Sequence, residues 1–163
     1  MKIFLIGMPG SGKSVIGRQL ALHFDLPFID LDAAIEEREG ISVQEIFKKK
    51  GEAYFRQKEA MILREVSGSV TGFIMATGGG APCFHEGIEI IKQSGVSIYL
   101  DVPLPALIRR NGKNATRPLL QEGNLEEKLS ALLAIRDSIY KQATFTVKGD
   151  QISVKDILTL LKT

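Results

Sequence analysis

The hydrophobic residues of this chain form short runs that alternate with longer stretches of helical periodicity. Fully apolar runs, such as the one over residues 3–6, are typical of strands that are covered on both faces of a sheet. The runs predicted to be strands are Lys2–Ile6, Pro27–Leu31, Phe73–Thr77, Val96–Asp101 and Phe145–Lys148. Because strands that alternate with helices form β-α-β units, the pattern predicts an α/β fold with a mostly parallel sheet.

The stretches between these runs have helical spacing, and some begin with typical capping residues. Ser42 with Glu45 is a capping-box pattern, Asn124 precedes two glutamates, and Ser153 precedes Asp156. The stretches predicted to be helices are Lys13–Phe24, Val43–Lys49, Glu52–Val66, Glu86–Gln93, Leu104–Arg110, Leu125–Ala143 and Val154–Lys162. Ligands of parallel sheets bind beyond the carboxyl ends of the strands, so we expect the functional site at that edge.

Residues 111–124 form a different kind of segment, rich in Gly, Asn and charged residues, between two predicted helices. One interpretation is a solvated loop. Loops of this length inside a small domain often cover a functional site. Arg117 in the middle of the segment makes us favour a mobile lid over residues 111–124.

The composition is that of an ordinary globular protein. The chain has 163 residues, 44% of them hydrophobic and 25% charged, which predicts a single domain over residues 1–163. A net charge of +2 is too small to indicate a nucleic-acid or membrane partner. The lone Cys83 cannot form an internal disulfide, which favours a reducing, cytoplasmic compartment. One cysteine and two histidines also leave no Cys/His metal cluster.

Residues 7–14 read GMPGSGKS and fit the phosphate-loop motif G-x-x-x-x-G-K-[ST] in full. The segment follows a predicted strand and opens a predicted helix, which is the context that the motif requires. Its glycines allow successive backbone N–H groups to point at phosphate oxygens, and the helix dipole adds to the attraction. Lys13 is then expected to reach the β- and γ-phosphates and Ser14 to bind Mg²⁺. The alternative, a glycine-rich turn with a surface lysine, does not account for the whole motif.

Phosphate loops occur in enzymes, in guanine-nucleotide switches and in ATP-driven motors. A switch usually carries an Asn-Lys-x-Asp segment that reads the base, and the sequence contains none. The chain is also short for a motor. A kinase that acts on a small metabolite is therefore favoured, with a switch as the alternative from another class.

Asp30 and Asp32 follow the second predicted strand, and residues two apart on a strand face the same way. Beside a phosphate loop, one carboxylate can bind magnesium and the other can orient an attacking hydroxyl group. The alternative for Asp32 is a helix N-cap, because a helical pattern begins directly after it.

Arg56 and Glu59 are three residues apart and share a helix face. They are either a surface ion pair or an arginine that Glu59 holds in place to bind a substrate carboxylate, and the spacing leaves both open. The glycines at 78–80 follow a strand and allow a ligand to touch the backbone. The spacing of Arg136 does not distinguish it from an ordinary surface arginine.

Together these segments resemble the shikimate kinase family over nearly the whole chain. The resemblance is carried by GMPGSGKS at 7–14, DLD at 30–32, FRQKE at 55–59, GGGA at 78–81, RRNGKNATRPLL at 109–120 and RDSIY at 136–140. It implies a P-loop kinase fold, with a five-stranded parallel sheet between helices and a lid. It also implies transfer of the γ-phosphoryl group of ATP to the 3-hydroxyl of shikimate, with Mg²⁺ as the metal ion. This reaction is a step in the biosynthesis of the aromatic amino acids, and the enzyme is expected to be a monomer.

The resemblance further assigns roles to single residues. Asp32 matches the aspartate that binds the shikimate hydroxyl. Arg56 and Arg136 match the positions that bind the carboxylate of shikimate. The resemblance also implies a shikimate-binding region over residues 32–60, which contains Arg56. Phe47 and Phe55 match apolar walls of the pocket. The expected catalytic residues are Lys13, Asp32 and Arg117, and the expected metal ligands are Ser14 and Asp30. The expected nucleotide-binding residues are Gly10, Ser11, Gly12, Lys13, Ser14, Val15, Arg110 and Arg117. The expected substrate-binding residues are Asp32, Arg56, Gly78, Gly79, Gly80 and Arg136.

One region departs from the family pattern. Many members carry an arginine and a proline in a loop that contacts adenine before the last helix, and residues 149–154 contain neither. The base contacts, and the strictness of the preference for ATP, are therefore left open. The alternative among kinases is a gluconate kinase-like enzyme, and the combination of the DLD, FRxxE and triple-glycine segments argues against it.

Overall fold

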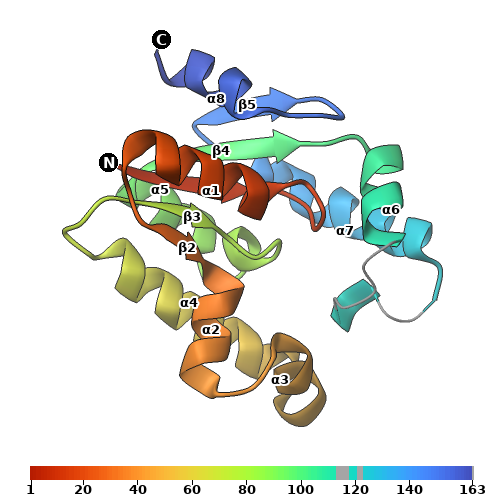
Figure 1. Cartoon of the computed structure of the whole chain (residues 1–163). Coiled ribbons are helices and arrows are strands. Elements are labelled where there is room, and N and C mark those ends of the chain that lie inside the picture. The colour runs from red at the N-terminus through yellow and green to blue at the C-terminus, as the bar shows by residue number, and fades with distance from the viewer. Residues whose placement is uncertain (113–117, 121–122, 163) are drawn as a thin grey trace.

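The computed structural model describes residues 1–112, 118–120 and 123–162, and its centre is a parallel sheet of five strands. The strand order is β2-β3-β1-β4-β5, and every neighbouring pair is parallel. Helices cover both faces of this sheet (Figure 1). The predicted α/β fold class and the five-stranded parallel sheet are therefore confirmed. The strands are β1 Lys2–Ile6, β2 Phe28–Asp30, β3 Phe73–Ala76, β4 Val96–Asp101 and β5 Phe145–Lys148.

The helices agree with the predicted ones to within a few residues, with one addition. Helix α2 was not among the predicted helices, because it begins directly after β2 with no loop between them. The α-helices are α1 Lys13–Phe24, α2 Leu31–Glu39, α3 Val43–Lys50, α4 Glu52–Ser67, α5 Gly87–Ser94, α6 Leu104–Gly112, α7 Leu125–Tyr140 and α8 Val154–Leu161. Two short 3₁₀ segments, η1 at Ala81–Cys83 and η2 at Pro118–Leu120, also occur. In the part of the chain that the structure describes, no helix is both long and apolar enough to cross a bilayer.

The capping residues read from the sequence act as helix starts in the structure. The side chains of Ser42, Asn124 and Ser153 each accept a hydrogen bond from a backbone N–H in the first turn of α3, α7 and α8. At α8 the Asp156 carboxylate also accepts from the Ser153 backbone, which completes a capping box. These local interactions explain why the starts of these helices were predictable.

The apolar character of β1 follows from its central place in the sheet. Alternate side chains of a strand point to opposite faces. Ile3 and Leu5 pack with α1 and α8 in one cluster, whereas Phe4 and Ile6 pack on the other face with the helices α4 to α7. All four side chains are fully buried, so β1 has no solvent-facing position for a polar residue.

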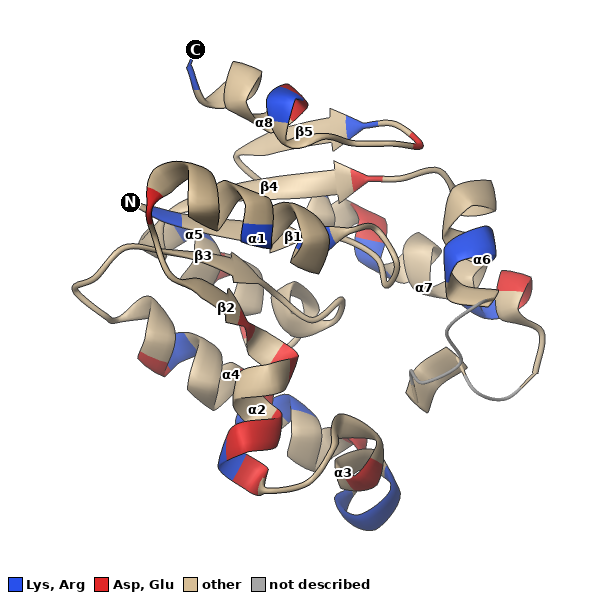
Figure 2. Ribbon diagram, in the orientation of Figure 1, with Lys and Arg blue, Asp and Glu red and all other residues tan. Residues whose placement is uncertain are grey.

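The carboxyl ends of the strands meet at one edge of the sheet, and this edge carries the chemistry. The phosphate loop, residues 7–14, connects β1 to α1, and Asp30 ends β2. The three glycines of residues 78–80 follow β3, and β4 ends at Asp101. Figure 2 shows acidic residues at the ends of β2 and β4. The expected location of the site at this edge agrees with the fold.

Candidate functional site

A cavity of about 520 Å³ lies over the phosphate loop, and we call it the loop pocket. Nearly all of its lining comes from one continuous segment at the start of α1. The lining residues are Gly10, Ser11, Gly12, Lys13, Ser14, Val15, Ile16, Arg110 and Ile152. Every residue of the described chain that was predicted to bind nucleotide therefore lines this cavity.

Backbone geometry explains the glycines of the phosphate loop. Gly10 and Gly12 have φ angles of 80° and 94°, in the region that favours glycine over residues with a Cβ atom. Gly12 is the N-cap of α1, so the helix begins at Lys13 with its first backbone N–H groups directed toward the loop. A helix N-terminus with glycine-rich backbone beside it is a binding site for anions such as phosphate.

The ammonium group of Lys13 lies back over the loop. Its Nζ atom donates to the backbone oxygens of Gly7 and Met8, at 2.8 Å each, and contacts Ser11 Oγ at 3.4 Å. The side chain is buried, so the loop holds a positive charge at the floor of the loop pocket. This charge can exchange carbonyl partners for the oxygens of a phosphate group.

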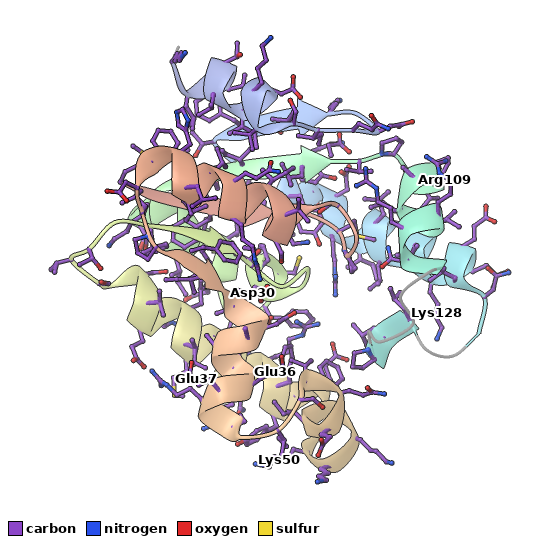
Figure 3. The ribbon with its side chains drawn as sticks, in the orientation of Figure 1. Asp30, Glu36, Glu37, Lys50, Arg109 and Lys128 are labelled. Carbon is purple, nitrogen blue, oxygen red and sulfur yellow. The ribbon has the colours of Figure 1, made fainter. Side chains whose placement is uncertain are left out.

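Ser14 and Asp30, the two predicted metal ligands, are in direct contact. The Ser14 hydroxyl donates to Asp30 Oδ2 at 3.0 Å. The other oxygen, Asp30 Oδ1, accepts from the backbone of Ala33 and caps α2. The helix cap is therefore Asp30, and the alternative in which Asp32 is the cap is wrong. Figure 3 labels Asp30 at the end of β2, where this cap lies.

Asp32 does not lie on the strand, which corrects the argument that it shares a strand face with Asp30. Strand β2 ends at Asp30, and Asp32 is in the first turn of α2. The helix turns the Asp32 side chain into a second cavity, of about 330 Å³. We call this cavity the arginine pocket, after Arg56 and Arg136. Its lining residues are Pro9, Asp32, Glu36, Ser42, Val43, Gln44, Phe47, Phe55, Arg56, Glu59, Gly78, Gly79, Gly80, Pro118, Leu119, Leu120, Leu132 and Arg136.

Arg56 and Glu59 form a buried ion pair, so the surface-pair interpretation is wrong. Arg56 Nη1 donates to Glu59 Oε1 at 2.9 Å, and the two side chains are only 5% and 2% exposed. Arg56 Nε also donates to Glu52 at 3.4 Å, and the guanidinium lies over the ring of Phe84. These contacts hold the plane of the guanidinium in one orientation in the pocket wall.

The second oxygen of the Glu59 carboxylate is fully buried and has no hydrogen-bond partner among the described residues. Burial raises the pKa of Glu59 to about 7, against the lowering effect of Arg56, and the nearby charge of Asp32 adds to the rise. The arginine pocket therefore contains a carboxyl group that titrates near neutral pH.

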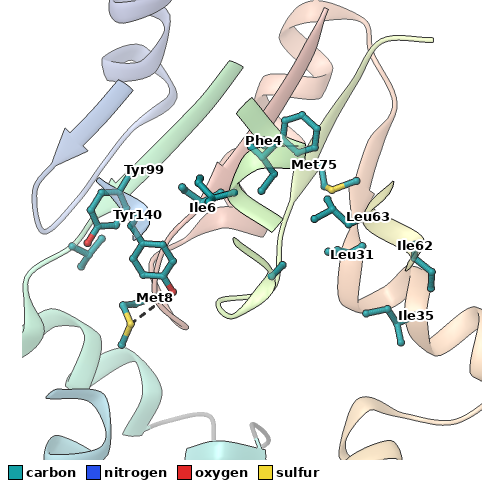
Figure 4. Packing of buried hydrophobic residues seen from close by; sticks show 14 of the residues in the cluster. Phe4, Ile6, Met8, Leu31, Ile35, Ile62, Leu63, Met75, Tyr99 and Tyr140 are labelled. Atoms are coloured by element: carbon teal, nitrogen blue, oxygen red, sulfur yellow. Dashed lines mark hydrogen bonds between the residues drawn. The ribbon is translucent and has the colours of Figure 1, made fainter. Parts of the chain in front are cut away.

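Arg136 lies on α7 and is 4% exposed, so it is not an ordinary surface arginine. One turn later, the buried Tyr140 hydroxyl donates to the backbone oxygen of Gly79 at 2.5 Å. Figure 4 shows Tyr140 packed beside Tyr99, with its hydroxyl directed toward Met8 of the phosphate loop. Helix α7 is thus fixed against both the triple-glycine segment and the phosphate loop.

The three glycines each lie against a charged side chain of the arginine pocket. A Cβ atom on Gly78 would be 2.9 Å from a Glu59 oxygen and 3.0 Å from Asp32 Oδ1. A Cβ on the second glycine would be 2.9 Å from Arg136 Nη1, and one on the third would overlap the Arg56 guanidinium. The absence of side chains at 78–80 allows all of these groups to converge on one strip of backbone.

Some lining residues were not predicted from the sequence. Glu36 lies one turn after Asp32 on the same face of α2 (Figure 3), and its Oε2 accepts from the Val43 backbone at 3.0 Å. The helical spacing from Asp32 is a signal that could have identified it. Leu132 of α7 and Ile152, which lines the loop pocket, belong to no motif. Phe47 and Phe55, predicted as apolar walls, pack with their ring centroids 4.8 Å apart.

Arg110 bridges the two segments expected beside a base. Its guanidinium donates to the Gly10 backbone oxygen at 3.1 Å and to the backbone oxygen of Asp150. In residues 149–154, where the sequence departs from the family pattern, Ile152 lines the loop pocket and the backbone oxygen of Asp150 accepts from Arg110. Arg117 and half of the predicted lid, residues 113–117 and 121–122, lie outside the described residues.

Comparisons with known proteins were made for the whole chain. The family model for shikimate kinase matches residues 9–162. A curated shikimate kinase from Halorhodospira halophila is 42% identical over 146 residues, which are 90% of this chain and 82% of that protein.

Solved structures show the same similarity in three dimensions. The shikimate kinase from Acinetobacter baumannii, solved in complex with shikimate, has a TM-score of 0.92 and 36% identity, and the match covers 99% of this chain and 90% of that one. The deoxyadenosine kinase from M. mycoides, solved with bound dATP, has a TM-score of 0.67 and 16% identity, with all of both chains covered. The latter similarity concerns the fold alone.

Proposed function

The chain belongs to the shikimate kinase family, whose members are ATP-dependent phosphotransferases of the shikimate pathway, and on this basis we propose that ATP binds in the loop pocket and shikimate in the arginine pocket. The observation that carries the proposal is that the two pockets meet at the phosphate loop. Pro9 lines the arginine pocket and Gly10 lines the loop pocket. A γ-phosphate held by the loop therefore lies beside a hydroxyl group held in the arginine pocket.

On the nucleotide side, the backbone N–H groups of residues 10–15 bind the phosphates. Lys13 exchanges the carbonyl oxygens of Gly7 and Met8 for β- and γ-phosphate oxygens and offsets their charge. Arg110 and Ile152 lie at the end of the loop pocket that receives the base.

On the acceptor side, Arg56 and Arg136 bind the carboxylate of shikimate. A planar guanidinium makes two parallel hydrogen bonds to a carboxylate, and Glu59 presets its orientation at Arg56. Both arginines are nearly excluded from solvent, which strengthens their attraction for an anion. The backbone of residues 78–80 contacts the ring of the substrate.

In the reaction, the 3-hydroxyl oxygen of shikimate forms a bond to the γ-phosphorus, and the bond from that phosphorus to the bridging oxygen of ADP breaks. Asp32 accepts a hydrogen bond from the hydroxyl group, orients its oxygen toward the phosphorus and takes the hydroxyl proton as the new bond forms. Catalysis by such a site consists of positioning and of stabilising negative charge, which Lys13 provides at the phosphate oxygens.

The oxygen atoms of Ser14 and Asp30 fit a magnesium ion. A hydroxyl and a carboxylate at 3.0 Å from each other, beside a phosphate site, are ligands that Mg²⁺ accepts directly or through water. Bound there, such an ion would supply positive charge that offsets the charge of the phosphates. Asp30 keeps its place through the cap of α2, independently of the ion.

Four further expectations stay predictions. The lid over residues 111–124 and the role of Arg117 fall partly or wholly outside the described residues. The monomer rests on the family resemblance alone. A cytoplasmic location is supported by the single, free Cys83. A single domain over residues 1–163 is supported by the one continuous sheet.

The test is an assay of ADP release with three acceptors, namely shikimate, gluconate and a nucleoside monophosphate. Release with shikimate alone is the expected result. Release with gluconate or with the nucleotide, and none with shikimate, would overturn the assignment of the arginine pocket.

A further inference from the structure

Asn111, near the end of α6, is a buried polar residue to which the sequence analysis gave no role of its own. The side chain is 4% exposed. Its Nδ2 atom donates to the backbone oxygen of Pro9 at 2.8 Å and to that of Leu107 at 2.9 Å. Because both partners are carbonyl oxygens, the amide must present its NH₂ group to them, which fixes the orientation of the side chain.

Gly10 lies directly on the Asn111 amide. A Cβ atom on Gly10 would be 2.7 Å from Asn111 Nδ2, and its φ angle of 80° also favours glycine. The preceding residue, Arg110, donates to the Gly10 backbone oxygen at 3.1 Å. Two consecutive residues of α6 thus hold two consecutive carbonyl groups of the phosphate loop.

The geometry of the peptide unit gives these contacts a consequence for ligand binding. In a trans peptide the C=O and the N–H point in opposite directions. The Pro9 oxygen is directed at Asn111, so the N–H of Gly10, in the same peptide unit, points away from α6 and toward the loop pocket. The orientation of this donor is therefore set from outside the loop by a side chain about 100 residues later in the sequence.

We propose that Asn111 is a positioning residue for nucleotide binding, which holds the phosphate loop in the conformation that receives the phosphates. This inference rests on the proposed binding of ATP in the loop pocket. Asn111 does not line that pocket and acts only through Pro9 and Gly10. Its loss is expected to weaken the binding of nucleotide more than binding in the arginine pocket, since of the two loop residues that Asn111 contacts only Pro9 lines that pocket.

Two substitutions separate the contact with the loop from the contact within the helix. Asn111→Leu has nearly the same shape and removes both hydrogen bonds without leaving a large cavity. Asn111→Ser keeps a hydroxyl that can donate to the carbonyl four residues earlier, that of Leu107, but is too short to reach Pro9. Thr159→Ala is the control, because the exposed Thr159 of α8 likewise donates to the carbonyl four residues earlier in its helix, that of Lys155.

The measurement is the dissociation constant of ADP with Mg²⁺, and separately that of shikimate, by isothermal titration calorimetry. Thermal unfolding of each variant shows first that it is folded. Both Asn111 variants are expected to bind ADP about 2- to 10-fold more weakly than the parent, the effect of one lost hydrogen bond. Shikimate affinity is expected to change less than about 2-fold, and Thr159→Ala is expected to keep both affinities within the same margin.

Unchanged ADP affinity in the folded Asn111→Ser variant would overturn the inference, and so would equal losses for ADP and shikimate. If Asn111→Leu does not fold, the serine variant alone decides. Lys13→Met separates this failure from failure of the proposed function. Weaker ADP binding in Lys13→Met with no effect at Asn111 refutes the positioning role alone, whereas unchanged ADP binding in both refutes the loop pocket as the nucleotide site.

Discussion

The two pockets of this protein are built in different ways. The loop pocket is made almost entirely by one continuous segment, residues 10–16, and presents mainly backbone donors. The arginine pocket is made by side chains from helices α2, α3, α4 and α7, by η2 and by the backbone of residues 78–80. The first can be recognised from a motif, because local sequence determines its shape. The second exists only after the chain has folded.

The pockets also hold their positive charges by different means. Lys13 is held by neutral carbonyl oxygens of its own loop, which a phosphate group can replace. Arg56 is held by the buried Glu59 carboxylate, which keeps its place when a ligand binds. The loop pocket is therefore expected to depend on charge compensation, and the arginine pocket on fixed geometry. Substitutions in each pocket test this difference.

Lys13→Met is expected to have the largest effect. Methionine has a similar length but no charge, so turnover is expected to fall by roughly 10²- to 10³-fold or more. Steady-state assays of ADP release measure the loss. Lys155→Met, at an exposed lysine of α8, is the control and is expected to keep full activity. Turnover near that of the parent in Lys13→Met would remove Lys13 from the mechanism.

Asp32→Asn is expected to come next, with a fall in turnover of roughly 10²-fold. The amide has the shape of the carboxylate but is a poorer acceptor and carries no charge. Since Asp30 caps α2, stability is expected to change little, and thermal unfolding checks this. Asp25→Asn, at an exposed residue with a positive φ angle that asparagine tolerates, is the control. A mild loss of turnover in Asp32→Asn would contradict its role at the hydroxyl group.

Arg56→Ala tests fixed geometry in the arginine pocket. Shikimate binding is expected to weaken by roughly 10- to 150-fold, and ADP binding much less, because a charge-assisted hydrogen bond is lost. Arg56→Lys is not expected to restore binding, because lysine lacks the planar fork. Arg64→Ala, on the exposed face of the same helix, is the control. Full recovery by lysine would mean that charge alone suffices, as it does in the loop pocket.

The same contrast explains how much of the molecule the sequence predicts. The bounds of β1, β4, β5 and α1 were predicted to the residue, because apolar runs and glycines determine them locally. Helix α2 was missed because the strand passes into the helix at Asp30 with no intervening turn residues. The expectation that Asp32 extends the strand was wrong for the same reason.

For the arginines of the arginine pocket, the burial of the side chain distinguishes interpretations that the spacing of residues in the sequence left open. The Arg56–Glu59 spacing fits an exposed pair and a buried one equally well, and only the packing around α4 distinguishes them. Arg136 is buried because α7 lies against residues 78–80, a contact between segments far apart in the sequence. Asn111 lies in the segment at 109–120 that carries the resemblance, but its role could not be read there, since its contact with Pro9 exists only in the folded chain.

Glu59 gives the smallest expected effect and the most specific one for the arginine pocket. Its ordinary pKa is 4.5, and burial raises it to about 7 in the folded protein. Between these values the folded protein keeps a proton that the unfolded chain has lost. The stabilisation from this group is therefore complete below pH 4.5 and is lost as the pH rises through 7.

The free energy of unfolding of the parent is thus expected to contain a term that falls between pH 5 and pH 8, by about 3 kcal/mol or less at about 1.4 kcal/mol per pKa unit. Glu59→Gln removes the titrating group and keeps an amide oxygen for Arg56, so this part of the slope is expected to disappear.

Glu65→Gln is the control, because Glu65 lies exposed on the same helix and its hydrogen bond with Arg38 lowers its pKa, outside this range. Urea denaturation at pH 5 and pH 8 measures all three proteins. An equal slope in the parent and in Glu59→Gln would show that burial does not raise the pKa of Glu59 into this pH range, and the charge of the Arg56–Glu59 pair would then not change between pH 5 and pH 8.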